Sequence, residues 1–198
     1  MNRLLIFILA CAAFASCKPE VYTPKPRGYF HIDLPKERVY RTFDSAGFPY
    51  SFEYPMYARI VTNPEFFGDS PENPYWINID FPEIGGKIYI SYKKIAGRNS
   101  IGQLNEDFYQ LTYTAHDKKA DYIQDMYFDD RSRNLYTGLF NVAGDAASAY
   151  QFYATDSVKH YIRGSLYFET QPNADSLQPL NDFLKQDIVH LLETLEWK

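Results

Sequence analysis

Apolar and polar residues alternate over several short stretches of the chain, a pattern typical of half-buried β-strands. Ile77, Ile79 and Phe81 are each separated by one polar residue, and a second alternating stretch follows after a short turn. We therefore predict a β-hairpin over residues 75–92. Residues 48–55 predict an earlier strand, and the prolines near its two ends suit the edge of a sheet.

The middle of the chain repeats the strand pattern. Four further runs are rich in aromatic and β-branched residues and are separated by short polar turns; they span residues 121–128, 134–141, 147–154 and 159–169. A tight turn at residues 155–157 should join the last two runs as antiparallel neighbours.

In two other stretches the apolar residues recur with the period of an α-helix. Ser100 and Gln103 have the spacing of a capping box, and a helix is predicted over residues 101–114. Its apolar residues recur at helical intervals: Ile101, Leu104, Phe108 and Leu111. A second helix should begin at a cap formed by Asp175 and Ser176. Its apolar stripe must pack against the sheet and consists of Leu180, Leu184, Ile188, Leu191, Leu192 and Leu195.

The predicted order of elements is strands, a helix, four strands and a final helix. This order predicts an α+β fold, with a largely antiparallel β-sheet and helices packed on it. It resembles the PsbP/Mog1-like fold, which is that of the photosystem oxygen-evolving P subunit and the Mog1 nuclear-transport factor. A fold does not by itself give a function, so the resemblance predicts architecture alone.

The first 16 residues have the layout of a bacterial lipoprotein signal peptide. A short positive segment containing Arg3 precedes an apolar run, and small residues stand directly before Cys17. We expect cleavage after Ser16 and acylation of Cys17, which would anchor the chain in a membrane. The apolar run is too short for a transmembrane helix, which needs about 20 residues. The alternative is an ordinary secretory signal that leaves Cys17 as a free thiol.

The residues that follow the signal divide into a tether and a domain. Residues 17–28 contain Pro19, Pro24 and Pro26, which forbid a helix and favour an extended, semi-rigid tether behind the lipidated cysteine. Residues 29–198 are long enough for one well-cored domain, so we predict a single α+β domain there.

Composition narrows the possible partners and chemistry. The formal net charge is −5, and removal of the signal, which carries Arg3, makes the chain slightly more acidic. We therefore expect no nucleic-acid partner. Cys11 lies in the signal and Cys17 would carry lipid, so the mature fold keeps no thiol for a disulfide, a metal site or a nucleophile. We expect no cofactor.

Candidate catalytic groups are sparse. The histidines are widely separated and lack metal-ligand spacing, so no metal is expected; they are His31, His116, His160 and His190. The sequence contains no nucleophile elbow, phosphate-binding loop or dinucleotide motif. Asp129 and Asp130 could serve a hydrolase or bind calcium, but Arg131 and Arg133 follow them and indicate a solvated turn. The pattern therefore favours a protein without enzyme activity.

One sheet face has the composition of a protein-contact surface. Strand alternation should bring five polar and aromatic side chains to the same side of the last two predicted strands: Gln151, Tyr153, Tyr161, Arg163 and Tyr167. Tyrosine and arginine are enriched where proteins bind one another. The alternative is that the opposite face forms the core and this face is its solvated side, or lies under a helix.

Several stretches of the sequence resemble one family, the gliding motility lipoproteins named GldD, from bacteria of the Bacteroidetes group. They are residues 22–30, 34–35, 48–55, 76–81, 147–148, 151–157, 163–168, 172–177 and 187–194. The resemblance covers nearly the whole mature chain and includes no catalytic signature. It implies membership of the cell-envelope apparatus that supports gliding and its associated type IX protein secretion.

These features predict a lipid-anchored envelope protein that binds or stabilises other gliding and secretion proteins. Because Lys18 rather than an aspartate follows Cys17, we expect the outer rather than the inner membrane. Only one acidic residue, Glu20, stands where surface-export signals cluster acids, so we expect the periplasmic face. The alternative function is a periplasmic binding module for a lipid or cell-wall fragment, held in a cleft lined by Trp76, Tyr89 and Tyr92.

Overall fold

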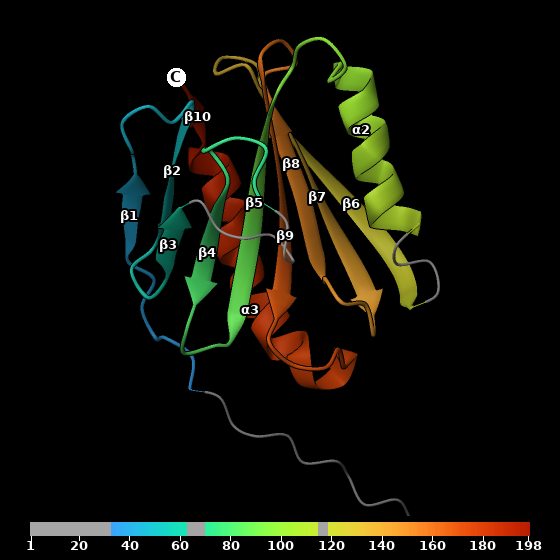
Figure 1. Ribbon diagram of the computed structural model, residues 1–198. Helices are drawn as coiled ribbons and strands as arrows, with labels where there is room; N and C mark the ends of the chain where they lie inside the picture. The colour runs from blue at the N-terminus through green and yellow to red at the C-terminus, as the bar shows by residue number, and fades with distance from the viewer. Residues whose placement is uncertain (1–32, 63–69, 115–118) are drawn as a thin grey trace, which may run out of the picture. The chain divides into compact units, whose positions relative to one another are not determined.

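The chain forms two antiparallel β-sheets with helices packed against them (Figure 1). A computed structural model describes residues 33–62, 70–114 and 119–198. The smaller sheet has the order β1 (Tyr40–Phe43), β2 (Tyr50–Pro55) and β10 (Glu196–Trp197). The seven-stranded sheet has the order β3 (Arg59–Thr62), β4 (Ile77–Phe81), β5 (Gly86–Lys94), β9 (His160–Phe168), β8 (Tyr150–Thr155), β7 (Leu135–Gly144) and β6 (Ala120–Asp130).

The described helical elements lie between and after these strands. They are α2 (Ile101–Tyr109), a π-helical turn η1 (Gln110–Thr114) and α3 (Ala174–Thr194). All strand pairs in both sheets are antiparallel. The predicted α+β class and antiparallel sheet are therefore confirmed.

The predicted hairpin is the pair β4 and β5. Ile79 lies opposite Ile88, and both side chains are buried. The turn predicted at residues 155–157 joins β8 to β9 as antiparallel neighbours. In this turn the Asp156 carboxylate accepts hydrogen bonds from the backbone N–H groups of residues 158, 159 and 160 at 2.7–2.9 Å. Such a carboxylate fixes a turn by satisfying donors that the ladder cannot reach.

The predicted edge position of the strand at residues 48–55 is wrong. β2 is the central strand of its sheet, paired with β1 on one side and with β10 on the other. Pro49 precedes the strand and Pro55 is its last residue, so the missing N–H groups fall at the strand ends. The Pro49 carbonyl even accepts from the backbone N–H of Lys198 at 3.0 Å.

The main core lies between α3 and the sheets. All six residues of the predicted stripe are buried: Leu180, Leu184, Ile188, Leu191, Leu192 and Leu195. Each contributes about 1.5–3 kcal/mol when fully buried. The helix begins two to three residues earlier than predicted, because the side chain of Asn173, rather than Asp175 or Ser176, caps it and accepts from the Ser176 N–H at 3.0 Å.

Helix α2 packs on the opposite face of the seven-stranded sheet, over β6 to β8 (Figure 1). Ser100 caps it as predicted, accepting from the Gln103 N–H at 3.2 Å. Leu104 and Phe108 are buried, but Leu111 is 44% exposed. The π-helical turn widens the spacing by about one residue and brings Thr112, which is fully buried, to the position predicted for Leu111.

No helix within residues 33–62, 70–114 and 119–198 is long and apolar enough to cross a membrane. The predicted signal peptide, the lipidated Cys17 and the tether at residues 17–28 all lie outside the described residues.

Candidate binding groove

The five residues of the predicted contact surface come together on one face of the sheet. In the β8–β9 pair, Tyr153 lies opposite Arg163 and Thr155 lies opposite Tyr161. Gln151 and Tyr167 follow on the same face by strand alternation. This is the face that carries α2, whereas Phe152, Ile162 and Leu166 belong to the core on the α3 side. We call it the outer face.

Helix α2 and the π-helical turn cover part of the outer face. Phe108 packs edge-on against Tyr153, with ring centroids 5.1 Å apart, and Thr112 Oγ1 lies 3.3 Å from Gln151 Oε1. Gln151 and Tyr161 are consequently only 3% exposed, while Tyr153, Arg163 and Tyr167 are partly buried. A helix therefore covers part of the predicted surface, and two of its five residues offer almost no area to a partner.

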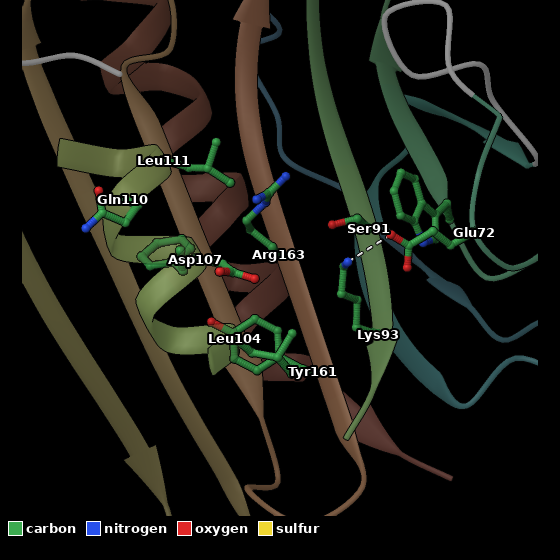
Figure 2. A pocket seen from close by; sticks show the side chains of 11 residues that line it. Glu72, Ser91, Lys93, Leu104, Asp107, Gln110, Leu111, Tyr161 and Arg163 are labelled. Carbon is green, nitrogen blue, oxygen red and sulfur yellow. Dashed lines mark hydrogen bonds and ion pairs between the residues drawn. The ribbon is translucent and has the colours of Figure 1, made fainter. Parts of the chain in front are cut away.

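Two hollows lie along the uncovered part, on either side of Arg163. The first has a volume of about 400 Å³ and lies between α2 and β5, with β9 as its floor (Figure 2). Leu104, Phe108 and Leu111 form its apolar wall. The second, of about 410 Å³, is lined by Gln151 and Tyr167, among others. Leu111 and Arg163 line both hollows, and we call the two together the α2 groove.

Arg163 is the central charged group of the α2 groove. Within the described residues, its guanidinium forms no hydrogen bond or ion pair. Burial lowers its pKa, and this effect is opposed by the nearby Tyr161, Tyr167 and Asp107. Arginine nevertheless stays protonated in proteins, so the groove contains a desolvated cation without a direct partner.

Two hydroxyl-bearing side chains line the first hollow together with this cation. Ser91 lies opposite Arg163 in the β5–β9 pair and is buried. The Tyr161 hydroxyl is buried and has no hydrogen-bond partner within the described residues. Burial, the largest effect, raises the pKa of Tyr161, so this hydroxyl stays protonated and remains a donor. An unpaired buried hydroxyl costs about 1–3 kcal/mol, and such groups are uncommon in folded proteins.

The far end of the first hollow is closed by an ion pair and an aromatic side chain. Lys93 Nζ lies 2.9 Å from Glu72 Oε1 (Figure 2). Trp76 Nε1 donates to the Tyr92 carbonyl at 2.9 Å. Of the three aromatic residues predicted to line a small-ligand cleft, Trp76 does so. Tyr92 instead faces the core, and Tyr89 packs edge-on against Tyr167 outside both hollows.

The candidate catalytic groups do not form a cluster. His31 and His116 lie outside the described residues. His160 Nδ1 is 2.8 Å from the Tyr92 hydroxyl, while His190 Nε2 is 2.8 Å from Glu53. His190 thus pairs with a carboxylate of β2. In the part of the chain that the structure describes, no three His, Cys, Asp or Glu residues are grouped to hold a metal ion.

The acidic pair Asp129 and Asp130 ends β6, directly before the turn at residues 131–134, and not within a solvated loop as predicted. Asp130 accepts from Ser132 Oγ at 2.6 Å and from Arg133 Nε at 2.7 Å. These hydrogen bonds lower the pKa of Asp130 to about 2. Its oxygens are therefore occupied by local donors that fix the turn.

A comparison with protein-family models assigns the chain to a family. The model described as gliding motility lipoprotein GldD matches residues 19–197. The chain belongs to the GldD family. Membership confirms the predicted resemblance and gives the chain a role in gliding motility and an association with the cell envelope as a lipoprotein. No curated protein matches the chain closely.

A solved structure confirms the fold. The solution structure of cyanobacterial PsbP (CyanoP) from Synechocystis sp. PCC 6803 is similar with a TM-score of 0.51 and 13% sequence identity. The match covers 88% of this GldD family member and 100% of that chain. At this identity the likeness shows the fold alone, and it agrees with the predicted PsbP-like architecture.

Sequence reasoning missed most of the α2 groove. Strand alternation places the side chains of Ser91 and Lys93 on the other face of β5 from the buried Ile88 and Ile90. The outward direction of Ser91 and Lys93 can therefore be read from the sequence. Their position beside Arg163 depends on the pairing of β5 with β9, which joins residues about 70 positions apart. No local pattern contains that pairing.

Proposed function

We propose that this GldD family member is a non-enzymatic lipoprotein that supports gliding and its associated type IX secretion by binding or stabilising other envelope proteins. The observation that carries the proposal is the α2 groove, where a desolvated arginine lies beside exposed apolar area. Protein interfaces concentrate arginine and aromatic side chains around such hollows. Membership of the family supports a role in gliding at the cell envelope, and the groove supports binding as the way in which the protein acts.

The test compares two exposed apolar residues. Leu111 lines both hollows and is 44% exposed, whereas Val158 is 68% exposed in the β8–β9 turn. Leu111→Glu should abolish colony spreading, because it places a charge on the rim of the groove, and Val158→Glu should leave spreading intact. Both variants must reach the envelope at wild-type amounts, measured by immunoblot. Normal spreading of the Leu111→Glu strain would contradict the proposed binding role.

The anchor is a separate part of the proposal. Two or three acyl chains on Cys17 would make anchoring effectively permanent, since each buried methylene contributes about 0.8 kcal/mol. Radiolabelled palmitate should enter the wild-type chain and should not enter a Cys17→Ser variant. We place the domain on the periplasmic face of the outer membrane, where a protease added to intact cells should leave it uncut. Efficient digestion would instead indicate that the domain lies on the cell surface.

The volume of the first hollow favours a second candidate function, the binding of a small lipid or cell-wall fragment. About 400 Å³ lies within the range of small-molecule sites, and Trp76 with Phe108 gives it apolar walls. Native mass spectrometry of the lipoprotein released from its own membrane should then show a co-purifying small molecule.

A further inference from the structure

The charged side chains that line the first hollow of the α2 groove sum to a formal charge of zero, and one of its two cations forms no ion pair in the part of the chain that the structure describes. Four charged side chains line it within the described residues: Arg163, Lys93, Glu72 and Asp107. Lys93 and Glu72 neutralise one another at 2.9 Å. Arg163 and Asp107 remain, and no hydrogen bond or ion pair joins them in the structure. The guanidinium is thus left with its donors unused.

We propose that Arg163 binds the carboxylate of an organic monoanion whose apolar part fills the hollow between α2 and β5. This inference deepens the proposed function, because it names the chemistry that the same groove recognises. A planar guanidinium with free donors matches a carboxylate in a bidentate geometry. The adjacent Ser91 hydroxyl can add a further donor to the same anion.

The apolar wall sets the rest of the ligand. Leu104 and Phe108 are buried on the side facing the sheet, while Trp76 forms the opposite wall. A hollow of about 400 Å³ accommodates a phenyl ring or a short aliphatic chain beside the carboxylate. Removing that group from water contributes about 25 cal/mol per Å² of apolar area. A bare inorganic anion would forgo this contribution.

Asp107 argues for one negative charge rather than two. Its carboxylate lines the same hollow and accepts from Gln103 Nε2 at 2.7 Å. Arg163 can neutralise one negative charge, and a second charge on a dianion such as phosphate would meet Asp107 with no further unpaired cation among the described lining residues. The carboxylate could belong to a free small acid or to the C-terminus of a peptide, since both present the same group.

The thermal stability of an Arg163 variant distinguishes a binding role of this arginine from a structural one. A partly buried charge that forms no hydrogen bond or ion pair costs stability, so its removal should not unfold the protein. We expect Arg163→Gln to unfold at a temperature equal to or above that of the wild type. A large fall in the unfolding temperature would show that the arginine serves the fold and would overturn the proposal.

The binding test uses the full lipidated chain in lipid nanodiscs and isothermal titration calorimetry. The probes are 3-phenylpropionate, its amide, inorganic phosphate, and an N-acetylated dipeptide ending in leucine with either a free carboxylate or an amide. We expect at least one carboxylate probe to bind, with both amides and phosphate at least about tenfold weaker. Preference for the dipeptide acid identifies a chain end as the source, and preference for 3-phenylpropionate identifies a small acid.

Variants complete the test. Arg163→Gln should weaken carboxylate binding at least about tenfold, whereas the exposed control Arg131→Gln should leave it unchanged. Asp107→Asn should strengthen it by about twofold to fivefold, because it removes a like charge, and its exposed neighbour control Glu106→Gln should not. Failure of every carboxylate to bind, or equal binding by Arg163→Gln, would falsify the carboxylate site. The spreading assay of Leu111→Glu decides the proposed function independently of this result.

Discussion

Arg38 Nη1 lies 2.6 Å from Asp187 Oδ1, in an ion pair that fastens the segment before β1 to the middle of α3. The Asp187 side chain is 1% exposed and also accepts from the hydroxyls of Tyr40, at 2.9 Å, and Tyr57. The Arg38 guanidinium lies 3.9 Å above the Phe183 ring. A buried carboxylate is tolerated here because three donors surround it.

Removing this carboxylate should destabilise the fold strongly. Asp187→Ala leaves the Arg38 cation and two hydroxyls without their acceptor, so we expect the free energy of unfolding to fall by about 3–5 kcal/mol. Urea denaturation monitored by circular dichroism measures the change. The control Asp182→Ala lies on the same helix but is exposed, and it should change the free energy by less than about 0.5 kcal/mol. A small effect of Asp187→Ala would show that the network is dispensable.

Two glycines should respond to the same substitution with opposite signs. A Cβ on Gly164 would lie 2.0 Å from Phe152 Cζ, and that ring is fully buried, so Gly164→Ala should cost about 1–3 kcal/mol. A Cβ on Gly102, in α2, would meet nothing within 4 Å. Gly102→Ala should therefore stabilise the protein by about 0.5–1 kcal/mol, because alanine favours a helix. Equal effects in thermal melts would refute the packing of Phe152 over Gly164.

The stability of the protein should fall as the pH drops below neutral. Burial lowers the pKa of His160 below its ordinary 6.5, an effect that Lys159 and Lys94 reinforce and Asp156 opposes. The unfolded chain therefore takes up the proton first, and the stability present above pH 6.5 is lost as the pH falls through the folded pKa. Urea titrations at pH 7 and pH 5 should show a smaller loss for His160→Gln than for the wild type.

The pH range in which His160 affects stability is distinct from the range in which Asp130 does so. Its pKa is lowered to about 2 from 3.8, so its contribution is lost only as the pH falls from about 4 to 2. A His160→Gln variant with an unchanged slope between pH 7 and 5 would assign the loss to another group.

The last strand should contribute measurably to stability. Trp197 in β10 stacks on His160, with ring centroids 5.3 Å apart, and pairs with Tyr50. Deletion of residues 196–198 uncovers this edge of β2, and we expect a loss of about 1–3 kcal/mol in urea denaturation. Lys198→Ala removes the exposed ion pair to Asp44 and should cost less than about 1 kcal/mol. Equal losses in the two proteins would assign the effect to the ion pair.

Local sequence patterns predicted most elements because those patterns record which side of each element is buried. The stripe of α3 and the β4–β5 hairpin are examples, since their burial follows the 3.6 and 2.0 residue periods. Leu111 departed from its expected burial because a π-helical turn shifts the phase of the helix, and nothing in residues 110–114 signals that shift.

The central position of β2 was not predictable from its neighbourhood. Its second partner, β10, is a two-residue strand about 145 positions away, too short to have a pattern of its own. The same limit applies to the groove, where β5 supplies Ser91, β9 supplies Arg163 and α2 supplies Asp107. Long-range pairing decides which side chains meet, and single-sequence periodicity does not contain it.

The place of β10 sets an order of events in biogenesis. Glu196 and Trp197 pair with residues 51 and 50, and the stripe that completes the core lies on the helix directly before them. Contacts between such distant segments form only when the whole chain is present. A growing polypeptide that still lacks residues 174–197 therefore cannot complete this core, and closure of the domain waits for the synthesis of these residues.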